Sequence, residues 1–266
     1  MHNRYGCNPP ITDVRDYRLA KAVGIELPEK YSIPNLPKVK NQREVSSCVA
    51  HATSSILEYY DINNGDNTLS TNFIYGIQNK HCGHNGSGMY LRDACKIVRD
   101  FGDMLEKDCP GNNEVPDSWD IAESSLNDED KANRAKAFVI KSYFKCSGEK
   151  DIKRAILNYG PVLCSVKWYD TFKCDNDGVL TGEKTGDYGY HAVMIYGWDE
   201  RGFLCQNSWG KDWGNRGRFV LPYSIGVREA HGMVDLEDSE IVAPPRNTFL
   251  DIIYKIINFF ANIFKN

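Results

Sequence analysis

Apolar residues in the first half of the chain recur at helical spacing. After Cys48 they return every three to four positions as far as Tyr60, which predicts a helix that begins at or near this cysteine. Ser70 suits the N-cap of a second, short helix. The amphipathic stretch 91–101 is followed by Gly102, which predicts a glycine C-cap. We therefore expect residues from about 31 to 135 to be mainly helical.

The second half of the chain has the short apolar runs and the alternation that are typical of strands. Such runs cover 138–140, 161–169, 202–206 and 217–223, together with the run that follows His191. One helix is expected among them, at 149–160. The pattern predicts an α+β fold with a helical lobe at about 31–135 and a lobe at about 136–235 that is a partly closed antiparallel barrel. A cleft between the lobes would have Cys48 on one wall and His191 on the other.

Residues 236–266 are expected to form a linker and an amphipathic C-terminal helix. From Thr248 onward, polar residues recur every three to four positions, so a helix here has a narrow polar stripe and a wide apolar face. These interruptions argue against a membrane-spanning helix, which needs about 20 mostly apolar residues. Three interpretations stay open: a helix at a membrane surface, a helix for self-association or a partner, and a helix docked on the protein itself.

The composition is that of an ordinary globular protein, with 41% hydrophobic residues in 266. The formal net charge of −4, without a block rich in Lys and Arg, gives no reason to expect nucleic acid as a partner. Residues 1–30 lack the apolar run of a secretory signal. We therefore expect a cytoplasmic protein, peripheral at a membrane if its C-terminal helix binds one, with most of its nine cysteines reduced.

Cys48 is the first candidate for chemistry. Unpaired N–H groups and the positive end of the helix dipole favour the ionised form of a thiol at a helix N-terminus, and the thiolate is the nucleophile. The alternative, on composition alone, is an ordinary buried cysteine. His191 and Asn207 stand beside two consecutive apolar runs, and pairing of two antiparallel strands would bring these side chains together.

The ordered motifs around these residues resemble those of the papain-like cysteine peptidases. In chain order they are Asn41-Gln42 before Cys48, His191-Ala192-Val193, Asn207-Ser208-Trp209-Gly210 and Trp213-Gly214. His191 and Asn207 follow Cys48 by 143 and 159 residues, close to the roughly 130–150 residues expected in this family. The resemblance covers about residues 27–232 and implies a two-lobed papain-like fold, peptide or protein substrates and no cofactor.

The resemblance also implies a role for each residue of the site. His191 would take the proton of Cys48, and Asn207 would orient the imidazole through its other ring nitrogen as the third member of a catalytic triad. The side-chain amide of Gln42 and the backbone N–H of Cys48 would stabilise the oxyanion, and one such donor contributes about 3 kcal/mol. These four residues are the expected catalytic machinery of a peptidase that works through a thioester acyl-enzyme.

Supporting roles are implied for three further residues. Trp209 is expected to pack over the histidine and asparagine and to shield them from water. Gly88 and its neighbour Met89 are expected to line the substrate groove, because a residue without a side chain lets substrate backbone approach closely. His51 is nearer to Cys48 in sequence, but three residues along a helix it would point away from the open face of the thiol, so we interpret it as structural.

Several features depart from the family pattern. Val49 stands where an aromatic residue usually follows the nucleophile, and Arg43-Glu44 replace Gly-Ser in the preceding loop. The charged pair would either reshape the oxyanion loop or select charged substrates. The residues His81-Cys82-Gly83-His84 are too closely spaced for an ordinary zinc site, so no metal is expected.

The N-terminal segment, residues 1–26, is expected to be extended because X-Pro steps disfavour helix. Its Asp13-Val14-Arg15-Asp16-Tyr17 resembles the N-terminus of the xylellain-like bacterial subgroup, in which a short segment can lie across the active-site cleft. The segment either regulates access to Cys48 or serves as a structural strap. Val45 occupies the position where secreted relatives carry a second cysteine, which fits a reducing compartment.

Three functions remain in competition at this point. The first is a cysteine-type peptidase, and the second is a catalytically weak module of the same fold that binds partners or tethers to a membrane. The third is an acyltransferase that uses the same thioester. The joint presence of Cys48, His191, Asn207 and Gln42 favours the peptidase.

Overall fold

The computed structural model describes residues 5–10, 26–62, 67–84, 87–111 and 117–235. The predicted C-terminal helix and most of the N-terminal segment lie outside these residues. Within them, no helix has both the length and the apolar character that crossing a membrane requires.

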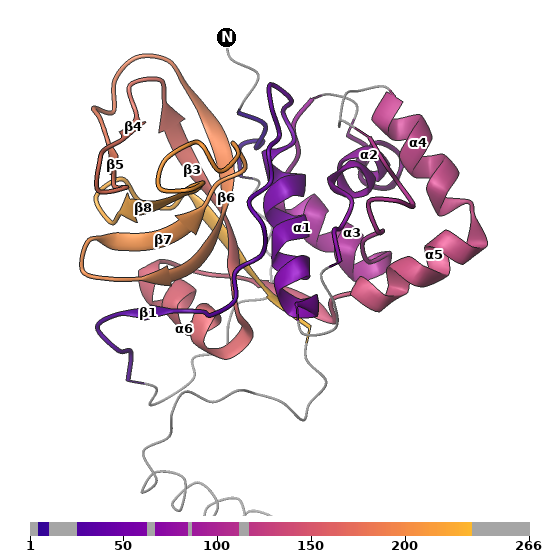
Figure 1. The fold of residues 1–266 in the computed structure, drawn as a ribbon, viewed down its shortest axis with the longest axis horizontal. Coiled ribbons are helices and arrows are strands. Elements are labelled where there is room, and N and C mark those ends of the chain that lie inside the picture. Colours follow the sequence, from indigo (N-terminus) through magenta and orange to yellow (C-terminus); the bar gives the residue numbers. More distant parts are fainter. Residues whose placement is uncertain (1–4, 11–25, 63–66, 85–86, 112–116, 236–266) are drawn as a thin grey trace, which may run out of the picture.

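The first half of the chain is mainly helical, as the periodicity predicts, with five α-helices among its described residues (Figure 1). They are α1 (Cys48–Asp61), α2 (Thr71–Cys82), α3 (Leu91–Asp100), α4 (Asp117–Leu126) and α5 (Glu129–Ala135). Ser70 is the N-cap of α2 and accepts a hydrogen bond from the N–H of Phe73. After α3 the chain leaves the helix at Phe101 and turns at Gly102, whose φ of 78° suits glycine.

An antiparallel sheet forms the other half of the molecule (Figure 1). Its strand order is β2-β9-β3-β6-β7-β8, with β1 also paired to β6, and β4 and β5 form a separate pair. The strands are β1 (Tyr31–Ser32), β2 (Ser142–Lys145), β3 (Val162–Tyr169), β4 (Lys173–Cys174), β5 (Leu180–Thr181), β6 (Tyr188–Trp198), β7 (Gly202–Gln206), β8 (Arg218–Pro222) and β9 (Glu229–Val234). Helix α6 (Glu149–Tyr159) packs against β3, β6 and β9.

The structure differs from the sequence-based expectation at several places, of which three concern the main sheet. The predicted strand at 138–140 is wrong, because residues Lys136–Phe138 form a 3-10 helix and the strand begins only at Ser142. Strand β9 was not expected, since it contains two polar residues, Glu229 and His231, which pair with each other at 3.0 Å. Strand β1 falls within the range expected to be helical, yet it pairs with β6.

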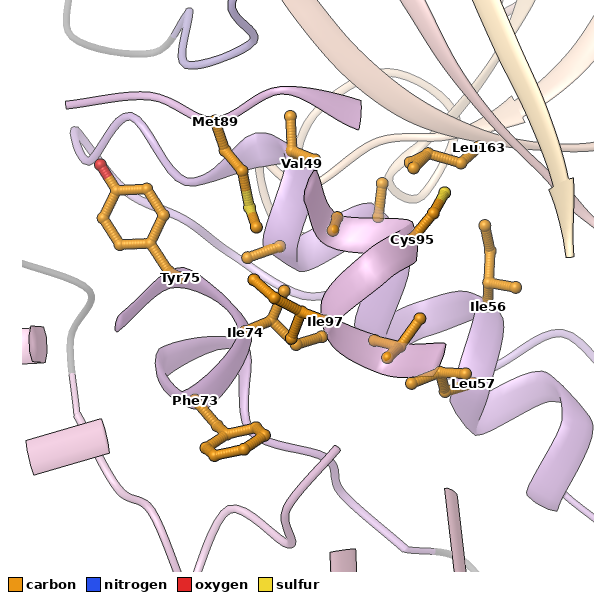
Figure 2. Close-up of a cluster of buried hydrophobic side chains, with 14 of the residues drawn as sticks. Val49, Ile56, Leu57, Phe73, Ile74, Tyr75, Met89, Cys95, Ile97 and Leu163 are labelled. Carbon is orange, nitrogen blue, oxygen red and sulfur yellow. The ribbon is translucent and has the colours of Figure 1, made fainter. Parts of the chain in front are cut away.

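Helix α1 is the element that joins the two halves. Its side chains are buried from Cys48 to Glu58, and it packs against α2 and α3 on one side and against β3 and β6 on the other. Figure 2 shows Val49, Ile56 and Leu57 of α1 in one apolar cluster with residues of α2 and α3, and with Leu163 of β3. A helix buried on all sides has a fixed position, so the start of α1 is held rigidly at the junction with β6.

Candidate active site

Cys48 is the first residue of α1, and its side chain is fully buried. The backbone N–H of Ala192, on β6, donates a hydrogen bond to its Sγ at 3.4 Å, and the backbone of Gly6 donates another. Burial nevertheless raises the pKa of the Cys48 thiol to about 11, although these backbone hydrogen bonds act in the opposite direction. The ionised thiol expected from the helix N-terminus is therefore not the state favoured here, because the sulphur is covered.

His191 and Asn207 meet as the pairing of antiparallel strands predicts. His191 lies within β6 rather than before it, and Asn207 directly follows β7, which pairs with β6. The Nε2 of His191 is 2.7 Å from the Oδ1 of Asn207, and this oxygen also accepts from the N–H of Ser208 at 2.8 Å. Since Oδ1 can only accept, Nε2 carries the ring proton, and Nδ1 is the nitrogen that can act as a base.

Tryptophan side chains enclose this pair. The ring of Trp209 stacks on His191 with centroids 4.6 Å apart and an interplanar angle of 29°. Trp168, from β3, meets the edges of both rings at 5.2 and 5.1 Å. His191 is fully buried and Asn207 is 3% exposed, so their hydrogen bond is kept from water. The sequence motif identified Trp209, whereas Trp168 carried no signal beyond its place in a strand.

Both polar atoms of the Gln42 side-chain amide are hydrogen-bonded. Its Oε1 accepts from the hydroxyl of Ser208 at 2.6 Å, and its Nε2 donates to the carbonyl of Val45 at 2.7 Å. Its backbone N–H also donates to the carbonyl of Ser208 at 2.8 Å. These bonds fix which way the amide faces, and they tie the loop before Cys48 to the segment after Asn207. Sequence reasoning missed the role of Ser208, although it is part of the matched motif.

Gly88 and Met89, which were expected to line the substrate groove, have different hydrogen-bond partners. The N–H of Gly88 donates to the hydroxyl of Tyr75, and its carbonyl accepts from Gln78, so its backbone is bound within the helical half. The backbone of Met89 instead bonds to residues of the N-terminal segment. A Cβ on Gly88 would lie 2.8 Å from Asn8 Oδ1, so the missing side chain makes room for that segment.

Residues 5–10, which we call the N-terminal strap, lie directly over Cys48. Met89 donates to the carbonyl of Gly6 and accepts from the N–H of Asn8, both at 2.8 Å, while Cys7 donates to the carbonyl of Tyr190 at 3.0 Å. A Cβ on Gly6 would lie 2.0 Å from the carbonyl oxygen of Ser46, so only glycine fits here. In Figure 1 this indigo segment passes between the two halves of the molecule.

The strap continues along the face that holds the histidine. The ring of Tyr5 meets the His191 ring edge-on at 6.4 Å, and its hydroxyl donates to Asp170 at 3.1 Å. Cys7 is only 6% exposed, and its thiol faces Ser165 of the neighbouring strand β3. The strap therefore covers the nucleophile and also contacts β3 and β6 beside it.

His51 does not take part in this arrangement. Its Nδ1 donates at 2.9 Å to the carbonyl of Ser47, the N-cap residue before α1. Burial lowers the pKa of His51 to about 3, so the imidazole is neutral. Among the described residues there is no group of three His, Cys, Asp or Glu side chains that could hold a metal ion, and His81 instead lies 3.3 Å from Glu123.

Comparisons with known proteins agree on one family. The family model described as "Papain family cysteine protease" matches residues 28–238. A cathepsin B-like cysteine proteinase of Haemonchus contortus is 30% identical over 165 residues, which cover 59% of this chain and 43% of the relative. A cysteine proteinase of Theileria parva is 28% identical over 239 residues, which cover 83% of this chain and 48% of the relative. The chain thus spans about half the length, or less, of these curated relatives.

A solved structure extends the match to the fold. The crystal structure of xylellain, a cysteine protease from Xylella fastidiosa, superimposes with a TM-score of 0.74 at 25% identity. The match covers 89% of this chain and 97% of that chain. The arrangement of helices and antiparallel strands is therefore that of a papain-like protein, as the motifs predict.

Proposed function

Because this chain belongs to the papain family of cysteine proteases, we propose that it is a cysteine-type peptidase that acts on peptides or proteins. The observation that carries the proposal is the contact of the Cys48 sulphur, at the start of α1, with the backbone N–H of Ala192 on β6, next to His191, whose ring makes a 2.7 Å hydrogen bond to Asn207. The side-chain amide of Gln42, whose Oε1 is held by Ser208, is the donor that we propose for the oxyanion.

The proposed reaction begins with transfer of the thiol proton from Cys48 to Nδ1 of His191. The thiolate attacks the substrate carbonyl carbon, and the Gln42 amide with the Cys48 N–H stabilises the oxyanion. His191 then gives its proton to the leaving amine, and the carbonyl group stays on sulphur as a thioester. Water, deprotonated by His191, hydrolyses the thioester and restores the thiol. Asn207 holds the ring throughout, and Trp209 keeps their hydrogen bond dry.

We also propose that the N-terminal strap inhibits the enzyme. Cys7 and Met89 form a parallel β-bridge, and the N–H of the neighbouring Gly6 is directed at the sulphur of Cys48. The carbonyl of Gly6 is bound to the N–H of Met89 and is therefore not presented to Gln42. A peptide bond in this orientation is a poor target for attack, so the strap blocks the site without being cut.

Reaction of Cys48 with a peptidyl epoxide tests both proposals. The full chain and a truncated chain that starts at Leu27 would be compared, with Cys48→Ala as the control for specific labelling. We expect rapid labelling only after truncation, together with hydrolysis of a mixed peptide library detected by mass spectrometry. If neither folded protein reacts, the peptidase proposal fails and the binding module becomes the better interpretation. Rapid labelling of both proteins at the same rate would refute inhibition by the strap and leave the peptidase proposal intact.

The same peptide library separates hydrolysis from acyl transfer. An added primary amine competes with water for the thioester. If micromolar amine already captures most of the acyl group, the chain is a transferase. Predominant hydrolysis at millimolar amine supports the peptidase.

A further inference from the structure

A polar cavity of about 260 Å³ lies on the helical half, behind the loop that carries Gln42. Its walls come from that loop, from α1, and from the segments before α2 and after α3. The lining includes Lys40, Asn41, Gln42, Arg43, His51 and Glu106. Two of these residues, Arg43 and His51, are features of the sequence that the proposed peptidase reaction does not use.

Arg43 supplies a positive charge to this cavity. The residue has a φ of 55°, in the left-handed region that favours glycine, and its N–H donates to the side chain of Asn41 at 2.9 Å. An arginine kept in such a conformation suggests a use for its side chain. Within the described parts of the chain, no ion pair involves its guanidinium group. The other cation, Lys40, already binds Glu58 at 2.6 Å.

His51 supplies a hydrogen-bond acceptor. Because its Nδ1 donates to the carbonyl of Ser47, the proton of the neutral ring is on that nitrogen and Nε2 has a lone pair. The side chain is 95% buried, since the residue is only 5% exposed, and it lines the cavity. No residue that the structure describes bonds to Nε2. A buried acceptor of this kind is stabilised when a ligand donates to it.

Glu106 supplies the complementary negative charge. Its backbone N–H bonds to Thr68 at 2.9 Å, which fixes the residue at the edge of the cavity. One cation, one anion and one neutral acceptor line the same cavity, and together they match a ligand that carries both charges itself. We propose that the cavity binds a zwitterion of the free amino-acid class, with its carboxylate on Arg43 and its ammonium group shared by Glu106 and His51.

The cavity volume fits this class of ligand. About 260 Å³ accommodates an amino acid and is below the range of about 300–1,000 Å³ that is typical of pockets for drug-sized ligands. Gln42 contributes to the wall, so an occupant would contact the loop that positions the proposed oxyanion donor. The proposal concerns binding alone and does not depend on the chain being an active peptidase.

Calorimetric titration of the full chain with L-alanine tests the proposal. Propionate, which lacks the ammonium group, and L-alaninamide, which lacks the carboxylate, are the matched controls. We expect each control to bind at least about tenfold more weakly, because each loses a charge-assisted hydrogen bond. Thermal melting with each of the twenty common amino acids at 20 mM, a concentration of about the order needed for a weak site, would show which side chain is preferred.

Variants place the ligand in this cavity. Arg43→Gln should weaken binding of L-alanine at least about tenfold, and Glu106→Gln should reduce the preference for L-alanine over propionate. Arg201→Gln, on a surface arginine of the other half, is the control and should leave binding unchanged. The proposal is overturned if none of the twenty amino acids raises the melting temperature, if propionate binds as well as L-alanine, or if Arg43→Gln binds normally while folded.

Discussion

Replacing Gly6 by alanine should uncover Cys48. The new methyl carbon would lie 2.0 Å from the carbonyl oxygen and 2.1 Å from the carbonyl carbon of Ser46, where carbon contacts normally require about 3.5–4.0 Å. The obstacle is backbone, so no side-chain rotation relieves it. Gly6 itself does not have a left-handed φ, so alanine adds no backbone strain, and the substitution tests close packing alone. The strap must therefore leave its place.

The size of the effect follows from the bonds that the strap loses. Besides the bond from Gly6 to the Cys48 sulphur, its backbone makes three hydrogen bonds with other backbone groups, two with Met89 and one with Tyr190. At about 1 kcal/mol each they total about 3 kcal/mol, which corresponds to about a hundredfold change in the ratio of covered to open protein. While the covered form dominates, the rate at which a peptidyl epoxide labels Cys48 should rise by about the same factor.

The assay compares second-order labelling rates of the full chain, Gly6→Ala and the truncated chain that starts at Leu27, which sets the upper limit. Tyr5→Phe is the matched control, because it keeps the strap backbone and removes the exposed hydrogen bond to Asp170. We expect the control to label less than about fivefold faster than the full chain. If Gly6→Ala labels at the rate of the full chain while the truncated chain labels rapidly, the close approach to Ser46 does not hold the strap.

Three further predictions concern the site itself. His191→Ala should reduce kcat for peptide hydrolysis by about 10²–10⁴-fold in the truncated chain, and a variant that retains full kcat while folded would exclude this histidine as the base. Ser208→Ala removes the hydroxyl that donates to the buried Oε1 of Gln42, so thermal or urea unfolding should show that the free energy of unfolding falls by about 1–3 kcal/mol. We also expect kcat to be reduced more than KM is changed. Normal stability and normal kcat would count against a positioning role for Ser208. Because burial raises the pKa of Cys48 to about 11, labelling of the full chain by iodoacetamide should increase as the pH rises from about 8 to 11, and a plateau near neutral pH would contradict this.

The same pKa shift predicts the sign of a stability change. An unfolded thiol has a pKa of about 8.5, whereas that of the covered Cys48 is about 11. Above about pH 8.5 the Cys48 thiol loses its proton in the unfolded chain and keeps it in the folded chain. The contribution of this thiol to the stability of the fold is therefore fully present below that pH. The contribution is then lost as the pH rises towards 11.

Much of the candidate site could be predicted because the patterns that indicate it lie within short stretches of the sequence. The apolar period after Cys48 predicts a helix that begins there, and the structure starts α1 at this residue. The runs beside His191 and Asn207 predict two neighbouring strands, and antiparallel pairing then brings the two side chains within hydrogen-bond distance. The family motifs are read from order and spacing along the chain, and they led to the same fold that the comparisons show.

Other features depend on contacts between distant segments, which no local pattern records. The hydroxyl of Ser208 reaches Gln42 across 166 positions of sequence, and strand β9 is buried although it contains Glu229 and His231, because those two side chains satisfy each other. At 138–140 the apolar run was wrongly predicted as a strand, since Ile140 is buried against α3, where its N–H bonds to Val98. The charge state of Cys48 was likewise decided by tertiary structure. The helix terminus favours a thiolate, but coverage by the strap removes the water that would stabilise it, and desolvation outweighs the local hydrogen bonds.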